Sequence, residues 1–161
     1  MASMHPVVAQ SDRYFIGCDI SPCLFEMNCR LRSMENAAMD LAADPALADH
    51  MLEKNEAFMI ALSEIACRRF PLDWLWTGDD IAGQLGMLMS PACWRDMIKP
   101  RLKRIFDIGK KHDLWIAYHS CGAIRPIIPD LIDIGLDVLN PIQCNCPGMD
   151  AADLKREYGK D

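Results

Sequence analysis

Two kinds of hydrophobic pattern alternate along the chain. Short runs in which nearly every residue is apolar predict strands of a parallel sheet, because strands that helices cover on both faces have no polar side. These runs predict strands at 14–20, 73–79, 114–118 and 137–143. Longer stretches whose apolar residues recur at helical spacing predict helices at 24–43, 45–69, 91–112, 125–134 and 149–158. The resulting order, β-α-α-β-α-β-α-β-α, is typical of an α/β fold in which helices connect parallel strands.

Some of the predicted helices begin with a recognisable start signal. Ser21-Pro22, Asp44-Pro45 and Ser90-Pro91 each place an N-cap residue before a proline that suits the first helical position. Pro100 falls inside the helix that starts at Ser90-Pro91 and is expected to kink or divide it. In the helix 45–69 the apolar residues are expected to share one broad face: Leu47, Met51, Leu52, Phe58, Met59, Leu62 and Ile65.

Three tryptophans lie in the predicted strands. Trp74 and Trp76 belong to the strand 73–79, and Trp115 belongs to the strand 114–118. Because these strands are predicted to be buried on both faces, the three indole rings are expected to lie in the core. The alternative is that they form a platform for a cofactor.

The length of the chain bounds its architecture. Only about four βα units are visible in 161 residues, whereas a closed eight-stranded barrel takes about 250 residues. The chain is therefore either a free-standing open α/β domain or part of a (β/α)8 TIM barrel, and its abrupt end after the last helix favours the barrel. Residues 1–13 are polar and expected to be loose, so the incomplete barrel segment would comprise residues 14–161.

Composition and charge exclude several classes of protein. With 51% hydrophobic and 25% charged residues, the chain resembles an ordinary soluble domain, and its net charge of −6 comes without a basic, aromatic-rich stripe for nucleic acid. No run approaches the roughly 20 apolar residues of a membrane span. The N-terminus lacks a signal-peptide pattern, so the eight cysteines are expected to be reduced thiols in a cytoplasmic protein.

The most informative polar residues are His119 and Cys121, at the end of the predicted strand 114–118. Residues i and i+2 of a strand point to the same face, so this imidazole and this thiol can converge on one point. Zinc accepts both ligand types, although a zinc site needs three or four ligands. The pair therefore predicts part of a metal site. The alternative is a packed strand end followed by a turn at Gly122.

Other polar residues follow neighbouring strands, where parallel α/β sheets place their functional sites. Asp79 and Asp80 are candidates for a catalytic or substrate-placing role, or else they cap the loop that follows. Gln143 is a candidate for binding substrate through a hydrogen bond. Cys144 and Cys146 lie near enough, in the loop after the next strand, to supply a further metal ligand, or else they are incidental loop cysteines.

Three parts of the sequence resemble one known family. They comprise 73–80 with 89–95 and 98–103, then 119–126 with 129–132, and finally 135–143 with 149–155. In this order and at this spacing they resemble the uroporphyrinogen decarboxylase superfamily, and within it the branch of cobalamin-dependent methyltransferases. The resemblance covers about residues 40–161 and extends loosely to Tyr14. It implies a (β/α)8 barrel of which this chain would be the middle half.

The resemblance also implies a chemistry. His119 and Cys121 match two of the three zinc ligands of the methyltransferases, whose third ligand is a cysteine that would lie beyond Asp161. In that branch zinc binds an acceptor thiol and lowers its pKa, and the thiolate takes a methyl group from a corrinoid, here a cobalamin on a partner protein. Asp79 or Asp80 would help to place the substrate.

Two alternatives remain open. The first is decarboxylation of uroporphyrinogen, a tetrapyrrole substrate of porphyrin biosynthesis, but the true decarboxylases use no metal and lack the pair formed by His119 and Cys121. The second is an inactive fragment, or one that needs a partner chain, since half a barrel leaves two open sheet edges through which a homo-oligomer could form. Bound zinc and the mass in solution would discriminate among these alternatives.

Overall fold

The computed structural model describes residues 5–160 and contains a parallel sheet of four strands in the order β1-β2-β3-β4. The strands are β1 (Gly17–Asp19), β2 (Trp74–Gly78), β3 (Trp115–His119) and β4 (Val138–Asn140). The helices are α1 (His5–Val8), α2 (Phe25–Arg32), α3 (Met34–Ala43), α4 (Pro45–Arg69), α5 (Pro91–Met97), α6 (Lys99–Lys111), the 3₁₀ turn η1 (Arg125–Ile127), α7 (Ile128–Asp133) and α8 (Ala151–Tyr158). Strands alternate with helices, so the predicted α/β fold with a parallel sheet is confirmed.

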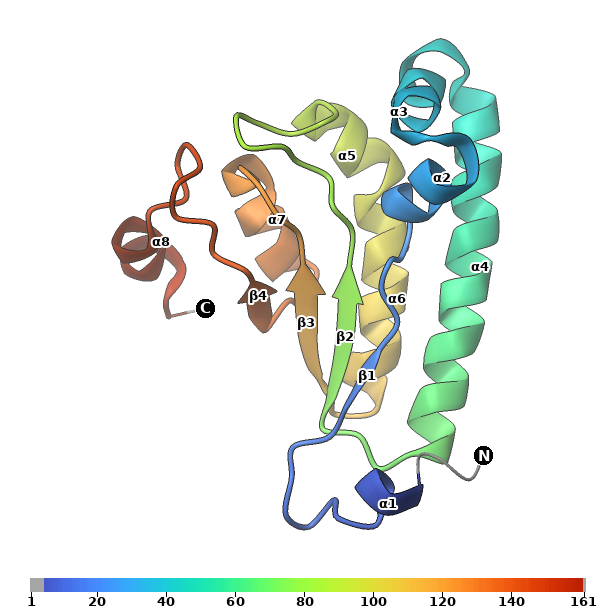
Figure 1. Ribbon diagram of the computed structural model, residues 1–161, viewed down its shortest axis with the longest axis vertical. Coiled ribbons are helices and arrows are strands. Elements are labelled where there is room, and N and C mark those ends of the chain that lie inside the picture. The colour runs from blue at the N-terminus through green and yellow to red at the C-terminus, as the bar shows by residue number, and fades with distance from the viewer. Residues whose placement is uncertain (1–4, 161) are drawn as a thin grey trace.

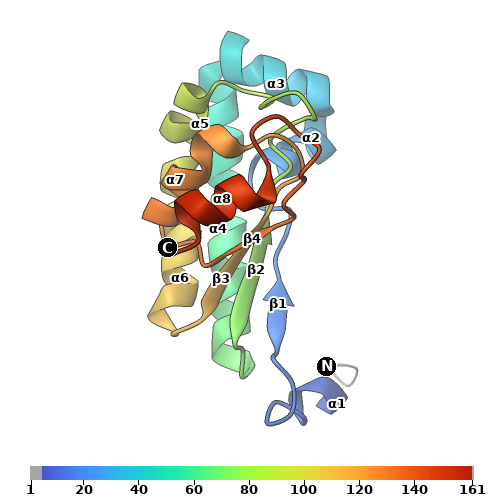
Figure 2. The ribbon, with the colours of Figure 1, turned by 90° about the vertical axis from the view of Figure 1, so that its left-hand side faces the viewer.

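The connecting helices cover one face of the sheet. In two perpendicular views α4, α6 and α7 lie on the same side of the strands, and among the described residues no helix crosses the other side (Figure 1; Figure 2). Each strand pairs with the strand before it in the chain. Successive strands are therefore added in one direction across the sheet. Because connections between parallel strands are nearly always right-handed, their helices all lie on the same face.

The two faces of the sheet differ in burial. Leu75 and Ile116 are fully buried under the helices. Trp74, Trp76 and Trp115 alternate with them along β2 and β3 and therefore lie on the face without helices, which we call the open face. Trp115 is 55% exposed, while Trp74 and Trp76 are half-buried against each other. The expectation of a core position is thus wrong for Trp115, because it assumed helices on both faces of the sheet.

The predicted cap signals at Asp44-Pro45 and Ser90-Pro91 are confirmed. Asp44 accepts a hydrogen bond from the N–H of Leu47 at 3.1 Å at the start of α4, and Ser90 accepts one from Cys93 at 3.1 Å at the start of α5. The expected division at Pro100 is also confirmed, since α6 begins one residue before it as a separate helix.

The region before α4 differs from the prediction. The single helix expected at 24–43 is divided into α2 and α3 at Ser33, whose φ of 74° lies in the left-handed region and ends α2. Ser21 does not cap this helix, because its hydroxyl donates to the carboxylate of Asp19 at 2.7 Å and α2 begins only at Phe25. The segment expected to be loose contains α1, and residues 1–4 lie outside the described residues.

α4 packs lengthwise against α6, with a buried face that is only partly the expected one. Leu52 and Met59 are buried as expected, but Phe58 and Ile65 are 59% and 42% exposed. Their place is partly taken by polar residues, including Glu56, whose carboxylate binds an arginine of α6 at 2.9 Å. Within residues 5–160, no helix combines the length and the apolar character that crossing a membrane requires.

Candidate metal centre

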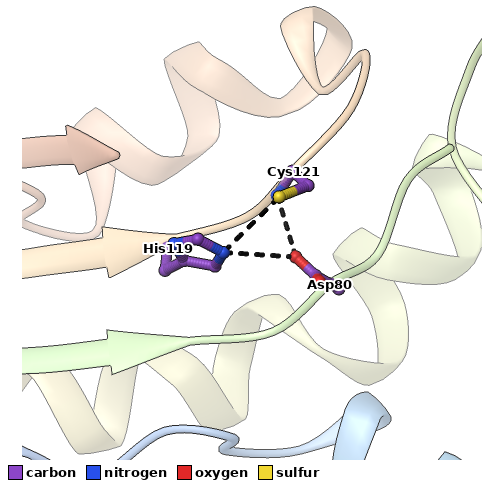
Figure 3. A group of neighbouring side chains, drawn as sticks. All are labelled: Asp80, His119 and Cys121. Atoms are coloured by element: carbon purple, nitrogen blue, oxygen red, sulfur yellow. Dashed lines mark hydrogen bonds and ion pairs between the residues drawn. The ribbon is translucent and has the colours of Figure 1, made fainter. Parts of the chain in front are cut away.

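The register of β2 and β3 brings three potential metal ligands together. Gly78 and His119 are paired in the parallel ladder, so the residues that follow them leave the sheet side by side. Asp80 comes two positions after Gly78, and Cys121 comes two positions after His119. Figure 3 shows the side chains of Asp80, His119 and Cys121 pointing toward one another beyond the carboxyl ends of the two strands.

The three ligand atoms are close to one another. Nε2 of His119 lies 3.6 Å from Sγ of Cys121 and 3.6 Å from Oδ1 of Asp80. All three ligand atoms lie within 4.8 Å of one another, and all three residues are half-buried. The backbone N–H of Cys121 donates to Oδ1 of Asp80 at 2.8 Å, which holds the carboxylate beside the thiol.

This set of donors fits zinc. An imidazole nitrogen, a thiolate sulfur and a carboxylate oxygen all bind zinc, with bond lengths of about 2.0–2.3 Å. At tetrahedral angles such bonds separate neighbouring ligand atoms by about 3.4–3.6 Å. The two distances of 3.6 Å from Nε2 of His119 agree with this spacing. Three protein ligands also leave one tetrahedral position open, as in catalytic zinc sites.

The turn after β3 holds Cys121 in place. Gly122 has a φ of 87°, and a Cβ atom there would lie 2.5 Å from the carbonyl oxygen of Gly83, so no other residue fits without strain. The N–H of Gly122 donates to Oε1 of Gln143 at 2.8 Å. Gln143, the predicted substrate-binding residue, therefore has its amide oxygen engaged by the turn that carries Cys121.

The surroundings of Cys121 keep its thiol protonated in the absence of metal. Burial raises the pKa of the Cys121 thiol above its ordinary value, and the carboxylate of Asp80 raises this pKa further. A metal ion binds the thiolate form of cysteine, so binding must release the proton of Cys121.

Asp79 has different surroundings from its neighbour Asp80. Asp79 is 1% exposed, and its carboxylate accepts hydrogen bonds of 2.9–3.1 Å from the backbone N–H groups of Leu24, Phe25 and Glu26. These bonds satisfy the free N–H groups at the start of α2. Burial raises the pKa of Asp79 to about 7, against the lowering effect of the backbone hydrogen bonds. Of the two predicted aspartates, Asp80 alone joins the group of ligands.

A small cleft lies next to the ligands. Its volume is about 230 Å³, and Asp80 and His119 line it together with Ser21, Arg30 and Trp76. The guanidinium of Arg30 forms an ion pair of 2.8 Å with a glutamate of α2. Asp80 and His119 thus share this cleft with residues of α2 and of the segment between β1 and α2.

Cys144 and Cys146 are outside the group of ligands that residues 5–160 form. Cys144 is exposed, and its thiol donates to the carbonyl of Ile142 at 3.4 Å. Cys146 is buried in the loop after β4, with 4% of its surface exposed. The third potential ligand atom of the group belongs instead to Asp80, two residues beyond the end of β2.

Reasoning from the sequence missed two features of this centre. One is the place of Asp80 among the potential metal ligands, although Asp80 follows the end of its strand at Gly78 by two positions, just as Cys121 follows His119. The other is Asn140 at the end of β4, whose Oδ1 lies 3.1 Å from Nδ1 of His119. No signal in the sequence marks Asn140, because its role depends on the register of β3 and β4.

No family model, no curated protein and no solved structure matches the chain. The candidate metal centre therefore rests on its own geometry, and the resemblance to the uroporphyrinogen decarboxylase superfamily stays a prediction.

Proposed function

We propose that the chain is part of a (β/α)8 barrel that binds zinc through Asp80, His119 and Cys121 and uses the metal to activate a small thiol for methyl transfer. The observation that supports the proposed metal site is the convergence of three suitable ligand atoms at the carboxyl edge of the parallel sheet. The methyl donor, a corrinoid on a partner protein, rests on the resemblance to the cobalamin-dependent methyltransferases.

Two features of the fold support the barrel. The strands follow one another in order with their helices on one face, whereas doubly wound sheets reverse their strand order and carry helices on both faces. The open face, with Trp74, Trp76 and Trp115, would then become the interior, which barrels fill with side chains. Barrel enzymes place their active sites at the carboxyl ends of the strands, where Asp80, His119 and Cys121 lie.

The residues of the centre have distinct tasks in this proposal. Bound zinc would act as a Lewis acid that lowers the pKa of a substrate thiol, so that a thiolate is available at neutral pH. Cys121 and His119 supply the sulfur and nitrogen ligands from β3 and its turn. Asp80 supplies an oxygen ligand from the neighbouring strand and also accepts the N–H of Cys121, which fixes the position of the thiolate.

The size of the adjacent cleft favours a small substrate. Its volume is about 230 Å³, whereas sites for drug-sized molecules have about 300–1,000 Å³. A tetrapyrrole is larger than a drug-sized molecule, so the part of the site that this chain forms has room for a small thiol but not for a porphyrinogen. Trp76 and Ser21 line the space that such a thiol would occupy beside Asp80 and His119.

The test is methyl transfer from methylcobalamin to 2-mercaptoethanol by the zinc-loaded chain, in which the thiolate takes the methyl group and the corrinoid leaves as cob(I)alamin. The change in corrinoid absorbance measures the rate. We expect transfer by the wild type and loss of transfer in His119→Ala and Cys121→Ser. The control Cys144→Ser removes an exposed cysteine outside the centre and is expected to keep the activity. Equal rates in the wild type and Cys121→Ser would contradict the proposal. Bound zinc without any transfer would overturn the methyl-transfer step alone.

A further inference from the structure

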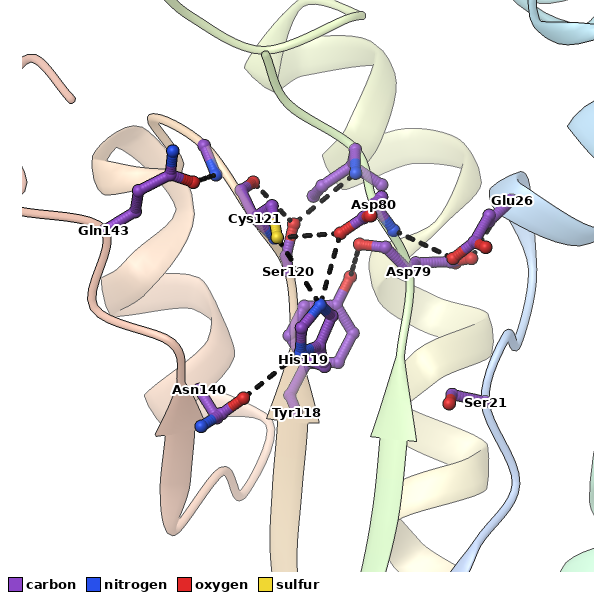
Figure 4. Close-up of polar contacts among 12 residues, drawn as sticks. Ser21, Glu26, Asp79, Asp80, Tyr118, His119, Ser120, Cys121, Asn140 and Gln143 are labelled. Carbon is purple, nitrogen blue, oxygen red and sulfur yellow. Dashed lines mark hydrogen bonds and ion pairs between the residues drawn. The ribbon is translucent and has the colours of Figure 1, made fainter. Parts of the chain in front are cut away.

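Asn140 and His119 face each other across the ladder between β3 and β4. They are paired in the parallel register, and Oδ1 of Asn140 lies 3.1 Å from Nδ1 of His119. Figure 4 shows Asn140 on one side of the imidazole ring, with Asp80 and Cys121 on the other. The ring is therefore held between an amide and the two other ligand atoms.

This contact bears on the protonation of the ring. A neutral imidazole carries one N–H, and a hydrogen-bond acceptor at Nδ1 favours the tautomer with the proton on Nδ1. The lone pair is then on Nε2, the nitrogen that faces Sγ of Cys121 and Oδ1 of Asp80 at 3.6 Å each. The opposite tautomer would direct Nε2–H at Oδ1 of Asp80, whose distance of 3.6 Å exceeds the normal range of about 2.7–3.2 Å for N–H···O bonds, or at Sγ of Cys121, which is only a weak acceptor.

We propose that Asn140 is a positioning residue that selects the Nδ1–H tautomer of His119 and orients its Nε2 lone pair toward the metal position. The part that concerns metal rests on the proposed zinc site, whereas the choice of tautomer does not. Histidine ligands of metals nearly always donate their other N–H to such a partner, and loss of the partner weakens metal binding.

The tautomer is tested on the metal-free chain by NMR of ¹⁵N-labelled histidine side chains. The measurement is made at about pH 8.5, above the ordinary imidazole pKa of about 6.5, and the signal of His119 is identified by its loss in His119→Gln. We expect Nδ1–H in the wild type and in Asn140→Asp, which keeps an acceptor at that place. We expect a shift toward Nε2–H in Asn140→Leu. Nε2–H in the wild type, or an unchanged tautomer in Asn140→Leu, would overturn the proposal.

The consequence for metal is tested by competition between the chain and a chelator for Co²⁺. Asn140→Leu is expected to weaken binding about 10- to 100-fold, whereas Asn140→Asp keeps or strengthens it. Asn145→Ala, an exposed asparagine in the loop after β4, is the matched control and is expected to bind as the wild type does. A wild type that binds no Co²⁺ would refute the zinc site and leave the tautomer result to stand. Binding that is equal in the wild type and Asn140→Leu would refute the role of Asn140 alone.

Discussion

Asp79 and Asp80 are consecutive residues whose carboxylates have different surroundings and different roles. The carboxylate of Asp79 is buried and accepts the N–H groups at the start of α2, so it joins the end of β2 to a helix. The carboxylate of Asp80 is half-exposed and lies beside His119 and Cys121. Because both residues follow one strand, the strand end supplies a structural cap and a potential metal ligand in adjacent positions.

This relationship predicts that substitution of Asp79 lowers stability, whereas substitution of Asp80 weakens metal binding. Asp79→Ala leaves buried N–H groups of α2 without an acceptor and is expected to lower the free energy of unfolding by about 2–4 kcal/mol. Asp80→Ala is expected to leave stability nearly unchanged and to weaken metal binding. Urea unfolding and a Co²⁺ titration of both variants check this pair. A loss of stability in Asp80→Ala equal to that in Asp79→Ala would contradict the assignment.

The raised pKa of Asp79 also predicts a dependence of stability on pH. Burial raises this pKa from 3.8 to about 7 in the folded chain, so between these two values the folded state binds more protons than the unfolded state does. The free energy of unfolding is therefore expected to fall as the pH rises through this window. Asp79→Asn removes the titrating group, so its free energy of unfolding should fall less steeply with pH than that of the wild type. Urea unfolding of both proteins at several pH values measures this difference. An equal fall in the two proteins would contradict the raised pKa of Asp79.

The turn at Gly122 predicts a sharp contrast between two glycines. In Gly122→Ala the new Cβ would meet the carbonyl oxygen of Gly83 at 2.5 Å, at a positive φ. We expect a loss of about 1–3 kcal/mol in the free energy of unfolding, together with weaker metal binding because Cys121 is displaced. Gly86→Ala is the control, since nothing lies within 4 Å of a Cβ there. Similar unfolding curves for the two variants would refute this account of the turn.

The raised pKa of the Cys121 thiol predicts that metal affinity depends on pH. A metal ion binds the thiolate form of Cys121, so binding releases the proton of this thiol. The apparent affinity for Co²⁺ is expected to rise about tenfold per pH unit until the thiol itself ionises. Chelator competition at a series of pH values measures this slope. Cys121→Ser is expected to bind Co²⁺ more weakly, with an affinity that depends little on pH. If the affinity of this variant depended on pH as steeply as that of the wild type, the released proton would not be that of Cys121.

The open face of the sheet predicts self-association of the isolated chain. Phe15, Trp115 and Val138 are exposed large hydrophobic residues in or beside this sheet, and Trp115 on the open face is 55% exposed. Exposed apolar surface of this kind favours association, as do the free edges of β1 and β4. Trp115→Lys is expected to lower the average mass measured by sedimentation, whereas Leu85→Lys, at an exposed side chain on the loop between β2 and α5, is not. Wild-type chain that is monomeric at all concentrations would contradict this prediction.

Much of the fold follows from local patterns in the sequence. The alternation of strands and helices follows from apolar runs, and the starts of α4 and α5 follow from Asp44 and Ser90, because a cap acts within a few residues of itself. The start of α2 could not be predicted in this way. Its cap is Asp79, which is distant in the sequence and reaches α2 only through the fold.

The candidate site shows the same division. His119 and Cys121 share one strand end, so their convergence follows from the spacing of side chains along a strand. The contributions of Asp80 and Asn140 depend on how β2 and β4 are aligned with β3. The sequence therefore indicates a metal site but does not separate Asp80 from Asp79. The exposure of Trp115 likewise depends on which face of the sheet the helices cover.

The metal centre is tested most directly by the binding of Co²⁺, a coloured substitute for zinc, to the purified chain. We expect one Co²⁺ per chain with a thiolate-to-cobalt charge-transfer band. We also expect loss of that band in Cys121→Ser, weaker binding in Asp80→Ala and His119→Ala, and no change in Cys144→Ser. A chain that binds no Co²⁺, or a charge-transfer band that survives in Cys121→Ser, would contradict the metal centre formed by Asp80, His119 and Cys121.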